Sequence, residues 1–148
     1  DRSADGGHLV FGLERDDVIG LETGQLMKHT RCRGDRIGTQ RDLQAGKLGA
    51  DADLATGQRA ARACALNIIA QLKAACGSDL DRVRRCGKLG GFVNATPDFI
   101  EAPQVINGAS DLIVEIFGEP GRHARFAVAC AALPRGVAVE VDAVVEIG

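Results

Sequence analysis

Strict alternation between two kinds of side chain marks the end of the chain. Every odd position from Val137 to Ile147 is aliphatic, whereas Glu140, Asp142 and Glu146 occupy three of the even positions. Successive side chains of a β-strand point to opposite faces, so this pattern predicts a strand with one core face and one polar face. The chain must therefore build a sheet that is covered on the aliphatic side.

A second apolar run, residues 124–133, precedes this strand and is separated from it by residues 134–136, which are Pro-Arg-Gly. Two such runs joined by a short segment with proline and glycine are typical of a β-hairpin. We therefore expect the two runs to be neighbouring antiparallel strands.

Two further segments carry apolar residues at helical spacing. Residues 53–76 begin with two candidate capping residues, Asp53 and Thr56, and residues 103–117 begin with Pro103, which suits the first turn of a helix. Residues 83–93 lie between them, and their three glycines favour a strand with a bulge over a helix. The order helix, strand, helix, strand, strand predicts an α+β fold, with two helices packed on one face of a mostly antiparallel sheet.

The N-terminal third of the chain is poorly patterned by comparison. Residues 9–11 predict a short strand and residues 18–26 a weak one, whereas residues 28–36 have no apolar period and are interpreted as a loop. The expected organisation is an N-terminal segment over residues 1–45, which contributes one short strand, and one domain over residues 46–148.

Composition argues against several functional classes. The formal charge is -2, and the chain has no Tyr or Trp, so a nucleic-acid partner is not expected. No apolar run approaches the roughly 20 residues that span a bilayer, and no membrane partner is expected. The five cysteines lack Cys-x-x-Cys spacing, and the three histidines share no metal-ligand spacing. We predict a cytoplasmic protein with no metal and no cofactor.

Short motifs in the second half of the chain resemble the RidA (YjgF, L-PSP endoribonuclease) family over about residues 46–148. The most specific resemblance joins the family's A-R-S-x-V strand, its L-P-x-G turn and its V-E-I-E-A strand. The matching residues are 121–128 and 132–143, with helix 60–75, the link 77–83 and the segments 98–99 and 105–107 as further matches.

The resemblance implies a fold, an assembly and an activity. Members have a chorismate-mutase-like subunit and form homotrimers with small-molecule clefts between subunits. They hydrolyse imines and enamines, such as 2-iminobutanoate and 2-aminoacrylate, to 2-keto acids and ammonia. Carried over by position, the arginine that binds the substrate carboxylate is Arg125, the glutamate that activates water is Glu140, and the cleft asparagine is Asn107.

Two alternatives to an imine deaminase stay open at this point. The family motifs P-Y-S-Q and S-G-Q have no counterpart in residues 1–45, which favours a non-catalytic member that binds small carboxylates. An L-PSP-type endoribonuclease is the third hypothesis, against which the charge and the scarcity of aromatic residues argue.

The residue pattern itself gives each candidate two interpretations. Arg125 opens an apolar strand, where its planar guanidinium suits bidentate binding of a carboxylate, but a surface arginine fits the same pattern. Glu140 shares its strand face with Asp142 and Glu146, as residues of a solvated face do. The two arginines beside His123 suit an anion pocket, but a loop histidine without a role fits the same pattern.

A hairpin centred between residues 134 and 135 fixes the register of the two candidates. It places Arg125 opposite Val144 and Glu140 opposite Ala129, an offset of four residues or about 13 Å. A three- or four-carbon imine cannot span that distance. We therefore predict that Arg125 of one subunit faces Glu140 of a neighbouring subunit in the trimer.

Overall fold

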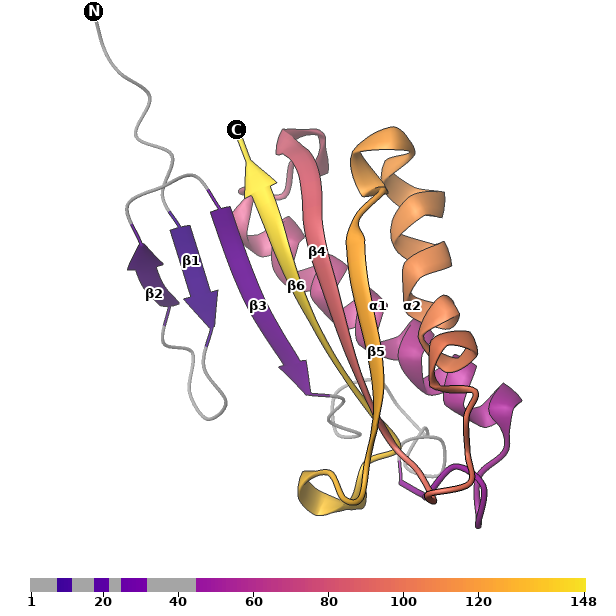
Figure 1. The fold of residues 1–148 in the computed structure, drawn as a ribbon. Helices are drawn as coiled ribbons and strands as arrows, with labels where there is room; N and C mark the ends of the chain where they lie inside the picture. Colours follow the sequence, from indigo (N-terminus) through magenta and orange to yellow (C-terminus); the bar gives the residue numbers. More distant parts are fainter. Residues whose placement is uncertain (1–7, 12–17, 22–24, 32–44) are drawn as a thin grey trace, which may run out of the picture.

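The computed structural model describes residues 8–11, 18–21, 25–31 and 45–148, which form a mixed sheet with two helices on one face (Figure 1). The strands are β1 (His8–Phe11), β2 (Val18–Leu21), β3 (Gln25–Arg31), β4 (Val83–Asn94), β5 (Ala124–Cys130) and β6 (Val139–Ile147). The helices are α1 (Leu54–Ala75) and α2 (Ala102–Phe117), with short 3-10 turns at η2 (Leu80–Arg82), η3 (Glu119–Gly121) and η4 (Pro134–Gly136). The predicted α+β class, with both helices on one face, is confirmed.

Local signals set the bounds of both helices. At the start of α1, an Asp53 carboxylate oxygen accepts a hydrogen bond of 2.8 Å from the backbone N–H of Thr56. Pro103 occupies the first turn of α2, where the missing N–H is no loss. Gly77 (φ 64°) and Gly118 (φ 63°) follow the last helical residues in a left-handed conformation that favours glycine.

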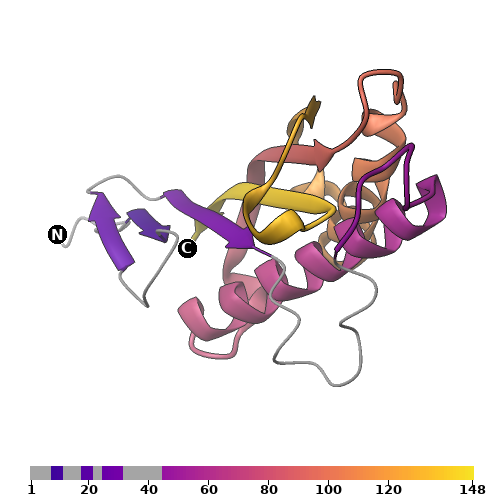
Figure 2. The same cartoon turned by 90° about the horizontal axis from the view of Figure 1, so that it is seen from below.

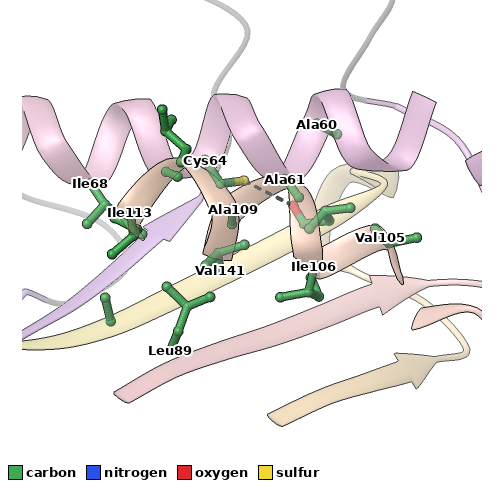
Figure 3. Packing of buried hydrophobic residues seen from close by; sticks show 14 of the residues in the cluster. Ala60, Ala61, Cys64, Ile68, Leu89, Val105, Ile106, Ala109, Ile113 and Val141 are labelled. Atoms are coloured by element: carbon green, nitrogen blue, oxygen red, sulfur yellow. Dashed lines mark hydrogen bonds between the residues drawn. The ribbon is translucent and has the colours of Figure 1, made fainter. Parts of the chain in front are cut away.

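The core lies between the two helices and the sheet (Figures 2 and 3). Helix α1 packs over β6 and β3, and α2 packs over β4 and β5. The odd-numbered aliphatic residues of β6 face the helices, as the alternation predicts. Residues at the centre of this core include Ala61, Cys64 and Ile68 of α1, Ile106 and Ile113 of α2, Leu89 of β4 and Val141 of β6.

The strand order is β2-β1-β3-β6-β4-β5, so the expected hairpin between the last two strands is wrong. Strand β4 lies between β5 and β6, parallel to β5 and antiparallel to β6. Its interior position satisfies backbone groups on both of its edges and buries its apolar side chains, which a β5–β6 hairpin would leave at an edge.

The connection between β5 and β6 passes around the end of β4. The N–H of Asn94 donates to the carbonyl of Ala138 at 2.9 Å, and the N–H of Ala95 donates to the carbonyl of Cys130 at 3.1 Å. Residues 131–138 are long enough to cross the two strand spacings, about 10 Å, that separate β5 from β6. The Pro-Arg-Gly segment therefore forms a 3-10 turn in a crossover.

Strand β3 extends the sheet beyond β6, to which it is antiparallel, and β1 lies parallel to β3. The short strand expected at residues 9–11 falls within β1. The loop expected from residue 28 is wrong for residues 28–31, because they belong to β3 and pair with β6; residues 32–36 lie outside the described residues. Within the part that the structure describes, neither helix combines the length and the apolar character that a membrane crossing requires.

Candidate functional site

The guanidinium of Arg125 is held against α2 at the outer strand of the sheet. Its Nη1 donates to Oδ1 of Asn107 at 2.7 Å and to Oγ of Ser110 at 3.1 Å. Asn107 and Ser110 are three residues apart, so they lie on the same side of α2, one turn from each other. The predicted pair of binding residues, Arg125 and Asn107, is thus brought into direct contact.

A histidine extends this group of side chains. Nε2 of His123 lies 3.0 Å from Oγ of Ser110, and Nδ1 of His123 lies 2.6 Å from the carbonyl oxygen of Gly121. A carbonyl only accepts, so Nδ1 carries the proton, and Nε2 of the neutral ring is then an acceptor. With the ring in this neutral tautomer, Ser110 donates its hydroxyl proton to Nε2 and accepts from Arg125.

These bonds leave one edge of the guanidinium available. Both hydrogens of Nη1 are directed at Asn107 and Ser110, whereas Nε and Nη2 make no hydrogen bond to the described residues. The ion pairs between described residues join Arg62 to Glu115, Arg85 to Glu146 and Arg122 to Glu119, and none involves Arg125. The Nε–Nη2 edge has the fork geometry that binds a carboxylate through two parallel hydrogen bonds.

Glu140 does not lie near Arg125 but on the opposite face of the sheet. It alternates along β6 with core residues that face the helices, so its carboxylate projects from the opposite face of the sheet. Both Glu140 (8% exposed) and Asp142 (5% exposed) are buried there. Within the described part of the chain, Oδ1 of Asp142 is buried without a hydrogen-bond partner, and it occupies space that a side chain on Gly90 would fill. The solvated acidic face expected for β6 is therefore wrong at these two positions.

The register relates Arg125 and Glu140 through β4. Leu89 is level with Arg125 and Ala143, so the expected pairing of Arg125 with Val144 is wrong. Phe92 is level with Glu140 on one side and with residue 128, not Ala129, on the other. The two candidates are offset by three residues, about 10 Å, in addition to lying on opposite faces.

Two members of the site were not predicted from the sequence. The sequence patterns do not single out Ser110, and they give His123 either no role or a place in an anion pocket beside two arginines. The available signal was that Ser110 follows Asn107 at helical spacing and that His123 shares a strand entry with Arg125. Neither spacing indicates by itself that α2 and β5 would bring the two side chains together.

A shallow surface depression of about 570 Å³ is lined in part by His123. Its lining includes Arg85, Lys88 and Arg122 but not Arg125. Arg85 and Arg122 already pair with Glu146 and Glu119, so this basic surface is largely neutralised. No group of three or more His, Cys, Asp or Glu side chains in the described ranges is arranged to hold a metal ion.

The sequence model of the family described as "YjgF/chorismate mutase-like, putative endoribonuclease" matches residues 21–146. Protein TCP17 of Trypanosoma cruzi is 59% identical over 103 residues, which make up 69% of this chain and 64% of TCP17. The chain thus spans less than two thirds of the length of that relative.

Two solved structures share the fold over most of their length. The protein Atu1372 from Agrobacterium tumefaciens superimposes with a TM-score of 0.78 at 46% identity, covering 86% of this chain and 79% of Atu1372. A "putative endoribonuclease" from Shewanella oneidensis MR-1 gives a TM-score of 0.79 at 34% identity, covering 94% and 89% of the two chains.

Proposed function

The chain belongs to the YjgF/RidA family, and from that premise we propose that it hydrolyses small 2-imino acids, such as 2-iminobutanoate, to 2-keto acids and ammonia. The observation that carries the proposal is the Arg125 guanidinium. Asn107 and Ser110 fix one of its nitrogens, and its Nε–Nη2 edge has no partner among the described residues. A cation held in this way at a protein edge suits the carboxylate that every 2-imino acid carries.

The reaction requires one carboxylate in addition to the arginine. Water adds to the imine carbon as Glu140 takes its proton, and the same proton is then given to nitrogen. The product is a carbinolamine, and Glu140 then moves the proton of its hydroxyl group to the nitrogen. The carbon–nitrogen bond breaks as the carbonyl forms, which releases a 2-keto acid and ammonia. An enamine such as 2-aminoacrylate is first converted to the imine by a proton shift to its terminal carbon, and the imine is then hydrolysed in the same way. No oxidant, metal or cofactor is needed to balance these steps.

Glu140 of the same subunit cannot serve Arg125, because the sheet separates the two side chains. We therefore place the site between subunits of a homotrimer, with Arg125 from one copy and Glu140 from the next. The proposal places the protein in the cytoplasm, the compartment predicted from its cysteine pattern.

The test is a coupled assay in which threonine dehydratase generates 2-iminobutanoate and the release of ammonia and 2-ketobutyrate is followed. The protein should accelerate release above the spontaneous rate, and Arg125→Ala should remove the acceleration. Arg122→Ala is the matched control, because Arg122 is an exposed arginine three residues away that pairs with Glu119. Release at the spontaneous rate with the intact protein would overturn the proposal.

The second candidate is a protein that binds small carboxylates without turnover. It is favoured by the separation of Glu140 from Arg125, since an assembly that does not join them would retain only binding. Calorimetric titration with 2-ketobutyrate would then show binding that Arg125→Ala abolishes, with no acceleration in the coupled assay. Under both candidates, single-stranded RNA incubated with the protein should stay intact.

A further inference from the structure

We infer that His123, acting through Ser110, is a positioning residue that holds the Arg125 guanidinium in its ligand-binding orientation. The inference rests on the proposed function, since it takes Arg125 as the group that binds the substrate carboxylate. It assigns a role to two residues that do not themselves touch the ligand edge of Arg125.

The direction of each hydrogen bond follows from its partners. The Gly121 carbonyl accepts from Nδ1 of His123, which leaves Nε2 as an acceptor for the hydroxyl proton of Ser110. The oxygen of Ser110 then presents its lone pairs to Nη1 of Arg125. The backbone of Gly121 therefore determines, through two side chains, which way the Ser110 hydroxyl points.

Because Ser110 is buried, the direction of its hydroxyl hydrogen bond affects how Arg125 is held. Ser110 is only 9% exposed, so water cannot readily replace a lost partner of its hydroxyl group. Without an acceptor at Nε2, the hydroxyl has to turn to another acceptor, such as the backbone carbonyl one helical turn earlier in α2, and its lone pairs then turn away from Nη1 of Arg125. The guanidinium would then lose one of its two fixed contacts, and its ligand edge would no longer be held.

The same contacts argue against Ser110 as a nucleophile. Although its hydroxyl faces a histidine, its oxygen accepts a hydrogen bond from a charged guanidinium, which withdraws electron density from the atom that would attack. Its burial further restricts access of a substrate carbon. Positioning of Arg125 is the role that agrees with both observations.

Nitrogen NMR tests the arrangement without any ligand. Long-range spectra of the intact protein should show His123 with its proton on Nδ1, and the Nη1 and Nη2 signals of Arg125 should be separate because rotation of the guanidinium is restricted. In His123→Phe, which keeps a ring but no acceptor, the two Arg125 signals should merge. A proton on Nε2 in the neutral ring, or unchanged Arg125 signals in His123→Phe, would overturn the inference.

Titration with 2-ketobutyrate gives the functional readout. We expect His123→Phe and Ser110→Ala each to weaken binding about tenfold, and the double variant to bind no more weakly than Ser110→Ala. His123→Gln, whose amide oxygen can accept from Ser110, should restore part of the affinity, as should Ser110→Thr relative to Ser110→Ala. A purely structural His123 would lower the melting temperature and leave this affinity unchanged, which would contradict the inference.

The two proposals can fail separately. If the protein binds 2-ketobutyrate in a His123-dependent manner but does not accelerate ammonia release, the deaminase proposal falls and the positioning role stands. If ammonia release depends on Arg125 but neither affinity nor the Arg125 signals respond to His123→Phe, the positioning role falls and the deaminase proposal stands.

Discussion

Arg125 and Glu140 project from opposite faces of one sheet, Arg125 towards α2 and Glu140 away from both helices. They belong to β5 and β6, which are separated by β4 and are not adjacent. A small ligand bound to Arg125 therefore cannot reach Glu140 of the same copy. If both residues act on one substrate, the second must come from another copy of the chain.

Complementation between two inactive variants tests this arrangement. We expect Arg125→Ala and Glu140→Ala to be inactive alone and to regain activity in mixed trimers. Every mixed trimer has one interface at which an intact arginine meets an intact glutamate, so purified mixed trimers should recover about one third of the wild-type activity. Co-expression with two different affinity tags, followed by sequential purification, isolates mixed trimers for the assay.

The control for this experiment is a mixture of Arg125→Ala with tagged Arg125→Ala, which cannot rebuild any site. Mixed trimers that remain as inactive as this control would show that both residues act within one subunit, or that one of them does not take part. A 15.5 kDa monomer in sedimentation at micromolar concentration would contradict the trimer itself.

Sequence patterns predicted those parts of the fold that local physics determines. The helix bounds follow from Asp53, Pro103 and the glycines after each helix, and the core face of β6 follows from its alternation. The neighbour of β6 could not be predicted in the same way. A Pro-Arg-Gly segment fits a hairpin and a crossover equally well, and the choice depends on β4, which is distant in the sequence.

In the candidate site, too, residues marked by local sequence motifs could be predicted, whereas contacts between distant segments could not. The family motifs identified Arg125 and Asn107, and in the structure Nη1 of Arg125 lies 2.7 Å from Oδ1 of Asn107. Ser110 and His123 belong to different elements, and their contact depends on how α2 packs against the entry of β5. The burial of Glu140 and Asp142 was missed because acidic residues on one strand face usually indicate solvent.

Close packing of the two helices gives a stability prediction. A Cβ at Gly108 of α2 would overlap the backbone carbonyl of Gln58 in α1, which cannot rotate aside. We expect Gly108→Ala to destabilise the protein by about 1–3 kcal/mol, despite the better helix propensity of alanine. Gly87→Ala is the matched control, since the nearest atom to its Cβ would be 3.7 Å away, and chemical denaturation measures both. Equal stability of the two variants would contradict the packing.

The thiol of Cys86 should be unreactive. Burial raises the pKa of Cys86 to about 11, so only about one thousandth of it is thiolate at pH 8. Iodoacetamide labelling followed by peptide mass analysis should modify the partly exposed Cys130 well before Cys86. Between pH 8 and 9.5 the labelling rate of Cys86 should rise about tenfold per pH unit. Labelling of Cys86 as fast as Cys130 at pH 8 would contradict this assignment.

The cap of α1 should make part of the stability dependent on pH. Hydrogen bonds from Thr56, assisted by the charge of Arg59, lower the pKa of Asp53 below its ordinary value of 3.8. Because the folded state favours the carboxylate, this contribution is fully present above the unfolded value and is lost as pH falls through the lowered folded value. Asp53→Ala should therefore reduce the denaturation midpoint more at pH 6 than at pH 2.5.

Asp53→Asn, which can still accept from Thr56 but cannot ionise, should be less destabilising and should share the flatter pH profile. Asp98→Asn, at an exposed position outside both helices, is the control and should keep the wild-type slope. A steep acid loss that persists in Asp53→Asn would assign the pH dependence to other carboxylates.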